Sequence, residues 1–172
     1  DQYEQAMEDL KRQGMKRLVI DLRSNPGGNL DTVCDILKTM LPEGVIVYTE
    51  DKNGTKTEYK NEENHTLDIP LVVLVNGMSA SASEIFTGAV QDYGIGTIVG
   101  TKTYGKGVVQ QLVDLQDGTY LKITISEYFT PKGRSIQKKG IEPDVTVEYE
   151  KNEQDENADN QLEKALEIVK QK

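Results

Sequence analysis

Three serines at alternating positions, followed by a glutamate, have the best placement in this chain for nucleophilic chemistry. Residues 79–84 (SASASE) lie between an apolar run that predicts a buried strand and a run that predicts a helix. Such a junction can expose a side chain beside backbone N–H groups that carry partial positive charge. Ser81 and Glu84 also fit the capping box S-x-x-E. The pattern therefore leaves two interpretations of Ser81 open, a nucleophile and a helix cap.

A serine nucleophile needs a base, and the chain offers one histidine and several lysines. His65 stands in a polar loop, which favours a solvated side chain over the base of a Ser-His-Asp triad. The G-x-S-x-G elbow is absent, because the nearest glycine before Ser81 is Gly77. A lysine is what remains, and Ser-Lys pairs are a recurring variant. Lys106 stands between two glycines, although this local pattern is also typical of a solvated turn lysine.

A nucleotide site is a competing interpretation of the same lysine. Residues 100–106 (GTKTYGK) fit the start of a phosphate-binding loop, G-x-x-x-x-G-K. Gly107 follows where such a loop needs Ser or Thr for magnesium, and residues 108–115 predict a strand where a helix is required. The pattern therefore argues against a nucleotide site.

Composition excludes several other classes of function. The net charge of −9, without a large basic cluster, argues against nucleic acid as a partner. Cys34 is the only cysteine, which excludes an intrachain disulfide and a cysteine-based zinc site, and its apolar helical neighbours predict a buried thiol. No apolar run approaches the ~18 to 20 residues of a membrane span. We expect no membrane contact by this chain, no metal and no cofactor.

Hydrophobic periodicity predicts the elements that must position these residues. We expect helices at residues 3–10, 30–41, 84–93 and 160–172, and strands at 17–22, 45–49, 55–59, 71–75, 97–100, 108–115 and 120–129. The hairpin at 45–59 is expected to be an exposed edge. This order of strands and helices predicts one mixed α/β domain, and residues 148–159, acidic and nearly free of apolar side chains, predict a solvated linker.

Several sequence blocks together resemble the bacterial C-terminal processing peptidases, also called tail-specific proteases. They are RLVIDLRSNPGG at 17–28, SASASEI at 79–85, QDYG at 91–94, YGKGVVQ at 104–110, TPKGRSI at 130–136 and GIEPD at 140–144. The resemblance implies a mixed sheet and helix superhelix of the crotonase and Clp-protease type. It implies that residues 1–147 are a serine peptidase core, in a chain that starts without Met and lacks the PDZ domain of the family.

The resemblance also assigns the catalytic side chains. It places Ser81 at the position of the nucleophile, Lys106 at that of the general base, and Gln110 at that of the residue that orients the lysine. The even separation of Lys106 and Gln110 predicts that both side chains lie on one face of a strand.

Two backbone amides complete the site that the resemblance implies. Gly27 and Ala82 match the positions whose N–H groups form the oxyanion hole, and Gly28 is a close rival for Gly27. The local pattern also fits a type II turn with Pro26 and Gly27 at its centre. The turn is compatible with an oxyanion role, because glycine lets a substrate approach the backbone.

The implied activity is endoproteolysis near protein C-termini through an acyl-enzyme. A neutral lysine takes the serine proton during attack on the carbonyl, and the lysinium then protonates the leaving amine. A free lysine has a pKa of ~10.4, so the site must be dry to disfavour the ammonium form. The implied partners are protein or peptide substrates with exposed C-terminal tails, and a homodimer is a further possibility. The implied location is extracytoplasmic, with the export signal or anchor outside this chain.

Two alternatives come from other classes of function. The first is a non-catalytic peptide-binding or scaffold fragment, since the family's fold also houses retinoid-binding and scaffold-like proteins. The second is an acyl-CoA enzyme of the crotonase type, which shares the fold and uses oxyanion amides without a Ser-Lys pair. The presence of both Ser81 and Lys106 favours the peptidase.

Overall fold

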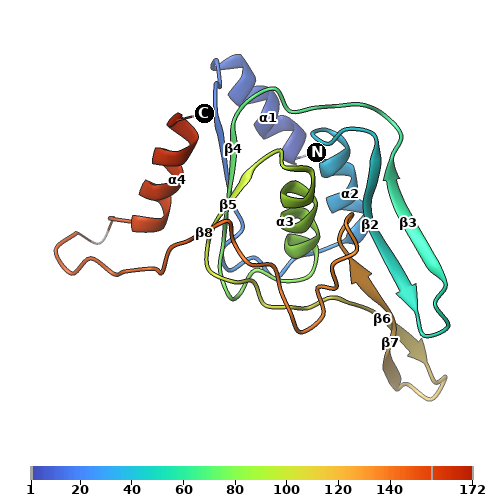
Figure 1. The fold of residues 1–172 in the computed structure, drawn as a ribbon. Helices are drawn as coiled ribbons and strands as arrows, with labels where there is room; N and C mark the ends of the chain where they lie inside the picture. Colours follow the sequence, from blue (N-terminus) through green and yellow to red (C-terminus); the bar gives the residue numbers. More distant parts are fainter. Residues whose placement is uncertain (1, 156, 172) are drawn as a thin grey trace.

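A computed structural model describes residues 2–155 and 157–171 of the chain. Within these residues, two four-stranded sheets form the framework of the fold (Figure 1). The first sheet is parallel, with the order β1-β4-β5-β8, and consists of β1 (Leu18–Asp21), β4 (Leu71–Val75), β5 (Thr97–Gly100) and β8 (Val145–Thr146). The second is antiparallel, with the order β3-β2-β7-β6, and consists of β2 (Gly44–Asp51), β3 (Lys56–Asn61), β6 (Val108–Asp114) and β7 (Tyr120–Phe129).

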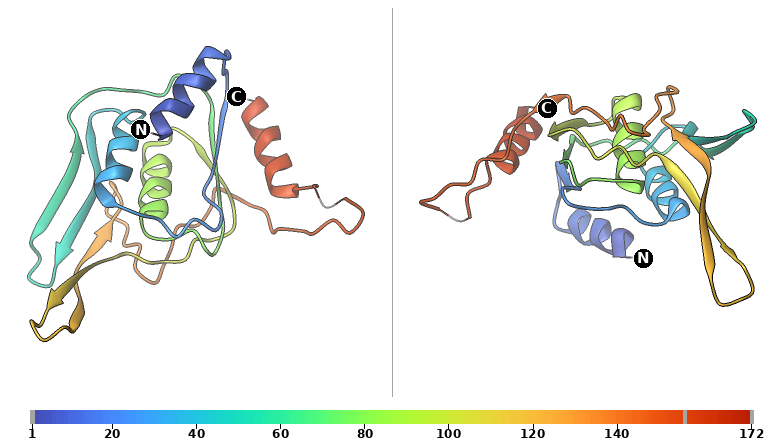
Figure 2. Two further views of the ribbon diagram at one scale, coloured as in Figure 1. Left: turned by 180° about the vertical axis from the view of Figure 1, so that it is seen from behind. Right: turned by 90° about the horizontal axis from the view of Figure 1, so that it is seen from below.

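Helices cover both faces of the parallel sheet (Figures 1 and 2). The helices α1 (Gln2–Arg12), α2 (Leu30–Lys38) and α3 (Ala82–Tyr93) lie on one side, and α4 (Asn160–Gln171) lies on the other. β4 is buried along its whole length for this reason. Leu71, Val73 and Val75 join the core under α2 and α3. Val72 and Leu74 pack with Ala165 and Val169 of α4, as the alternation of a strand between two layers requires.

The mixed α/β class and the single domain predicted from the sequence are confirmed. The predicted helices and strands are present with shifted ends, and β8, only two residues long, was not predicted. The second helix ends at Lys38 instead of residue 41, with Thr39 as its C-cap. Cys34 is buried as expected, and burial raises the pKa of its thiol to about 11.

The prediction of an exposed edge hairpin at residues 45–59 is wrong for its first strand. β2 pairs with β3 on one side and with β7 on the other. Ile46 and Val47 are buried, and Tyr48 stacks on Phe129 with 5.0 Å between the ring centroids. Of the two strands of this hairpin, β3 lies at an edge of the sheet and β2 does not, because β7, a long-range partner that the local pattern cannot show, covers β2.

After β8 and a loop, the chain returns to the parallel sheet as α4.

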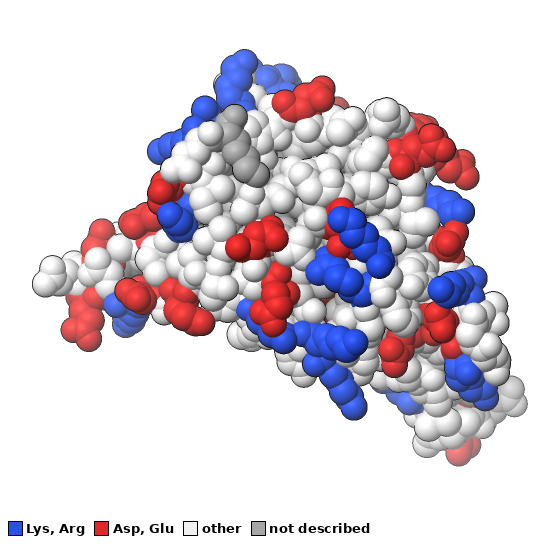
Figure 3. Space-filling model, in the orientation of Figure 1, with Lys and Arg blue, Asp and Glu red and all other residues white. Residues whose placement is uncertain are grey.

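No helix in the described ranges is long and apolar enough to cross a membrane. Lys172, the last residue of the predicted helix, lies outside the described residues, as does Glu156 of the predicted linker. Acidic and basic side chains lie side by side over the face shown in Figure 3.

Candidate active site

The three serines at the start of α3 have different environments. Ser79 is fully buried, and its hydroxyl donates to the Leu22 carbonyl oxygen at 2.7 Å. The hydroxyl of Ser83, also buried, donates to the Asn25 carbonyl oxygen at 3.1 Å. Ser81 is half-buried, and its side chain makes no capping hydrogen bond. The flanking serines therefore tie α3 to the loop after β1, and Ser81 is the one whose hydroxyl is available for chemistry.

The backbone of Ser81 is strained. Its φ of 58° and ψ of −118° lie outside the regions that non-glycine residues adopt easily. An N-cap residue normally has β-region angles, so these angles are not those of a simple cap. Strain of this kind costs about 1–3 kcal/mol and persists only where the surroundings enforce it. A sharp, strained turn from strand to helix is the arrangement that exposes a nucleophilic serine in other hydrolases.

The capping interpretation is nevertheless correct in part. Ser81 and Glu84 have the arrangement of a capping box, in which the Ser81 N–H donates to Oε2 of Glu84 at 3.0 Å. The amide of Glu84 donates to the Ser81 carbonyl oxygen at 2.8 Å. The box thus places the Ser81 side chain near the Glu84 N–H and the Glu84 carboxylate against the Ser81 N–H, and of these two contacts only the second is a hydrogen bond.

Glu84 links this turn to the loop that carries Lys106. Its carboxylate is fully buried, and Oε2 accepts the N–H of Lys106 at 2.8 Å as well as that of Ser81. Oε1 accepts the Gly105 N–H at 2.7 Å and the Thr103 hydroxyl at 2.6 Å. The sequence pattern showed only the capping role of Glu84, because the other partners lie about twenty residues further along the chain. One buried carboxylate thus holds both proposed catalytic residues by their backbones.

The side chain of Lys106 is exposed, in contrast to the dry environment expected for a lysine base. It lies in the loop between β5 and β6. Within residues 2–155 and 157–171, no hydrogen bond joins the amine of Lys106 to the hydroxyl of Ser81. The structure therefore brings the two backbones together and leaves the two functional groups unpaired.

Gln110 lies in β6, and its side chain is exposed. Its Nε2 is 3.5 Å from the Thr124 hydroxyl on β7. The argument from even spacing is wrong, because Lys106 precedes β6 and a register shift separates Val109 from Gln110. Strand alternation therefore does not relate the side chains of Lys106 and Gln110.

The glycine turn lies directly against the first amide of α3. A Cβ added to Gly27 would be 2.4 Å from the Ala80 carbonyl oxygen and 2.6 Å from the Ala82 nitrogen, and φ is +86°. Only glycine permits this approach. The Gly27 N–H donates to Oδ1 of Asn25 at 2.9 Å, whereas the described hydrogen bonds give the Gly28 N–H no acceptor. Gly28 also has open space around its Cβ position.

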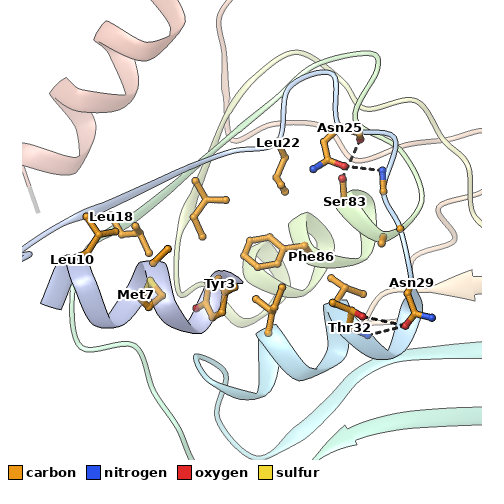
Figure 4. Close-up of a pocket in the computed structure, with 17 residues that line it drawn as sticks. Tyr3, Met7, Leu10, Leu18, Leu22, Asn25, Asn29, Thr32, Ser83 and Phe86 are labelled. Carbon is orange, nitrogen blue, oxygen red and sulfur yellow. Dashed lines mark hydrogen bonds between the residues drawn. The ribbon is translucent and has the colours of Figure 1, made fainter. Parts of the chain in front are cut away.

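An apolar cavity of about 470 Å³ opens beside these amides (Figure 4). Its walls come from α1, β1, α2 and α3, and they include the side chains of Tyr3, Met7, Leu18, Val33 and Phe86. Gly27, Gly28 and Ala82 line the same cavity. A peptide carbonyl at the amides of the turn would therefore have an apolar space next to it for a neighbouring side chain.

The other candidate residues are placed away from this chemistry. His65 is exposed in the loop between β3 and β4 and pairs with Glu63, which confirms the expectation of a solvated side chain. Lys102 forms an ion pair with Glu142 at 2.7 Å. The glycine loop that resembles a phosphate-binding loop is followed by β6, which confirms the strand predicted there in place of the helix that such a loop requires. Within the described residues, no cluster of His, Cys, Asp or Glu is arranged to hold a metal ion.

A family model and curated relatives match the same large part of this sequence. The sequence model of peptidase family S41 matches residues 1–147. The carboxyl-terminal-processing protease of Synechocystis sp. is 46% identical over 143 residues, which cover 83% of this chain and 34% of that protein. The corresponding protease of Picosynechococcus sp. is 44% identical over 145 residues, covering 84% of this chain and 35% of that protein. The chain thus spans about a third of the length of these relatives.

Solved structures show the same architecture. The photosystem II D1 C-terminal processing protease matches with a TM-score of 0.79 and 39% identity, over 85% of this chain and 38% of that chain. A lipoprotein from Streptococcus agalactiae matches with a TM-score of 0.77 over 99% of this chain and 60% of that one. At 20% identity the second match shows the fold alone.

Proposed function

The chain belongs to peptidase family S41, and on this premise we propose that it is the catalytic core of a serine endopeptidase that cleaves proteins near their C-termini. The observation that carries the proposal is the turn at Ser81, which combines a strained serine, an available hydroxyl and two neighbouring backbone amides. The curated relatives that support it are named carboxyl-terminal-processing proteases. The proposed fold type is that of the crotonase and Clp-protease superhelix.

We propose that Ser81 and Lys106 act as a Ser-Lys pair. The neutral amine of Lys106 takes the proton of Ser81 as the hydroxyl oxygen bonds to the carbonyl carbon. The peptide C–N bond then breaks, the amine leaves with the proton from Lys106, and an acyl-enzyme remains. A water molecule gives its proton to Lys106, attacks the ester and releases the new C-terminus, and the proton returns to Ser81.

Two backbone N–H groups stabilise the oxyanion in this mechanism. Ala82 supplies one of them from the first turn of α3, where backbone N–H groups lack partners within the helix. The glycine turn supplies the other. The match to the family favours Gly27 as the donor. The hydrogen bonds favour Gly28, because the Gly27 N–H already donates to Oδ1 of Asn25. Gly27 then has the role of bringing the turn close to Ala82.

The mechanism requires the side chain of Lys106 to turn toward Ser81. The backbone of Lys106 is already fixed by Glu84, so rotation about the side-chain bonds of the lysine is the movement required. A bound peptide would exclude water from the pair and disfavour the ammonium form. Gln110 is proposed to orient the amine once it has turned inward.

The proposed substrates are proteins or peptides with exposed C-terminal tails. The apolar cavity beside the glycine turn would accept an apolar side chain of the substrate. A homodimer and an extracytoplasmic location are further proposals for the whole protein, and they rest on the family resemblance alone.

A fluorophosphonate probe tests the proposed function in the full-length protease, because it labels only an activated serine. We expect labelling and peptide cleavage by the wild type and neither by the Ser81→Ala variant. The control is Ser126→Ala in β7, which should be labelled as fully as the wild type. Labelling that persists in Ser81→Ala would contradict the nucleophile assignment. A wild type that neither labels nor cleaves would favour the binding or acyl-CoA alternatives.

A further inference from the structure

Arg23, the second residue after β1, is held by two carboxylates and an amide. Its side chain is 16% exposed. Nε and Nη2 donate to the Asp21 carboxylate at 3.0 and 2.7 Å, and Nη1 and Nη2 donate to the two oxygens of Asp159 at 2.9 and 2.7 Å. Nη1 also donates to Oε1 of Gln161 at 3.0 Å. Each of the five guanidinium N–H groups therefore has an acceptor.

Two of these acceptors belong to the start of α4. Asp159 caps the helix, because its Oδ1 accepts the Leu162 N–H at 2.9 Å and its carbonyl oxygen accepts the Glu163 N–H at 2.8 Å. Gln161 is buried and donates to the Val147 carbonyl oxygen at 2.7 Å, next to β8. The guanidinium of Arg23 holds the pKa of Asp159 below its usual value. Arg23 thus donates hydrogen bonds to two side chains at the start of α4, those of Asp159 and Gln161.

Arg23 immediately precedes the turn that carries the glycine amides. Ser24 has a φ of 56°, a strained value for a residue other than glycine. Its N–H donates to Oδ1 of Asn76 at 2.9 Å, and the Asn25 carbonyl oxygen accepts the Ala80 N–H at 3.0 Å. A turn with this strain keeps its shape only if both of its ends are fixed. Arg23 stands at the end of the turn that leaves the sheet.

Apolar contacts, besides this ion pair, hold α4 against the parallel sheet. Ala165 and Val169 pack against Val72, Leu74 and Val99 on the sheet, which gives the helix an apolar anchor. Partly buried ion pairs contribute little net stability, because desolvation opposes the attraction between the charges. What Asp159 adds is a fixed direction for the guanidinium, since the two groups meet in a bidentate geometry.

We propose that Asp159 is a positioning residue of the active site, which fixes Arg23 and, through Arg23, the turn that carries the oxyanion amides. This inference rests on the proposed peptidase function. It extends the functional unit beyond residue 147, where the match to the family model ends. Asp159 touches no reacting atom in this role. Its loss should disturb the transition state more than it disturbs substrate binding.

The test uses variants of the full-length protease that separate capping from positioning. Asp159→Asn and Asp159→Ser keep a good N-cap residue and lose the bidentate carboxylate. We expect each to lower kcat roughly tenfold or more with little change in KM, and to slow fluorophosphonate labelling by a similar factor. Asp159→Glu, which keeps the charge, should recover part of the loss. The control Val169→Ala loosens the apolar anchor of α4 and should lower Tm while kcat stays unchanged.

The outcomes separate the two levels of the proposal. If the wild type is labelled at Ser81 and the Asn and Ser variants react at the wild-type rate, the positioning role of Asp159 is overturned and the peptidase function stands. If Val169→Ala slows labelling as much as Asp159→Asn does, general loosening of α4 explains the effect and the inference fails. A wild type without labelling overturns the proposed function, and the positioning role falls with it.

Discussion

The turn that carries Ser81 and the loop that carries Lys106 meet at the carboxylate of Glu84, yet their side chains are constrained to different degrees. At the turn, the strained backbone of Ser81 lies between two buried serines that are hydrogen-bonded to the loop after β1. At the loop, the backbone of Lys106 is fixed and its long side chain is exposed.

This difference indicates which part of the candidate site is held rigidly before a substrate binds and which part has to move. The strained turn positions the proposed nucleophile and the proposed oxyanion amides before any substrate arrives, and this positioning is the part of catalysis that depends most on exact distances. The lysine needs only to reach its partner, and rotation about its side-chain bonds can do that. Changes at the turn should therefore affect both stability and activity, whereas changes at the end of the lysine side chain should affect activity alone.

Replacement of the lysine should have the largest effect on activity and almost none on stability. In Lys106→Ala we expect cleavage to fall by about three orders of magnitude or more, and Lys106→Arg should be equally inactive because a guanidinium does not lose its proton. The unfolding free energy should stay within about 0.5 kcal/mol of the wild type, since the side chain is exposed. Peptide cleavage and thermal unfolding measure the two effects. Lys102→Ala is the matched control, and loss of activity there would count against the assignment.

Replacement of Glu84 should disturb the turn at Ser81 and the loop at Lys106 together, because its carboxylate binds both. In Glu84→Gln, a side-chain NH₂ group replaces one of the oxygens that accept buried N–H and O–H donors, and at least one donor loses its partner. We expect a loss of about 1–3 kcal/mol in unfolding free energy and a roughly 10- to 100-fold loss in kcat. Chemical denaturation and steady-state kinetics test this prediction. Glu167→Gln on the exposed face of α4 is the control, and unchanged kinetics in Glu84→Gln would show that the shared carboxylate is only structural.

The two glycines of the turn give the smallest and most local comparison. Gly27→Ala places a Cβ against Ala80 and Ala82 at a positive φ, so we expect about 1–3 kcal/mol of destabilisation and reduced labelling of Ser81. Gly28→Ala meets open space and should leave the unfolding free energy close to that of the wild type. Thermal unfolding of the two variants side by side makes the comparison. Equal losses in both would mean that the close approach at Gly27 does not matter.

The sequence predicted what depends on neighbours in the chain. Periodicity located the buried strand before the serines, and the spacing of Ser81 and Glu84 predicted a capping contact that the structure contains. It could not show that Glu84 also binds the loop at residues 103–106, because that contact arises only when distant segments pack. The even spacing of Lys106 and Gln110 misled for a related reason, since strand alternation applies only within a regular strand.

The hydrogen bonds between Arg23 and Asp159 also bear on when the proposed active site forms during synthesis on the ribosome. Domains made from the N-terminus onward begin to fold while later residues are still being added. Ser81 and the glycine turn leave the ribosome well before the first turn of α4, whose partner Arg23 precedes that glycine turn. On the proposed role of Asp159, a nascent chain would carry Ser81 without a firmly shaped oxyanion site. Peptidase activity would then begin only after residue 159 has left the ribosome, and the nascent chain would be protected from its own cleavage until that point.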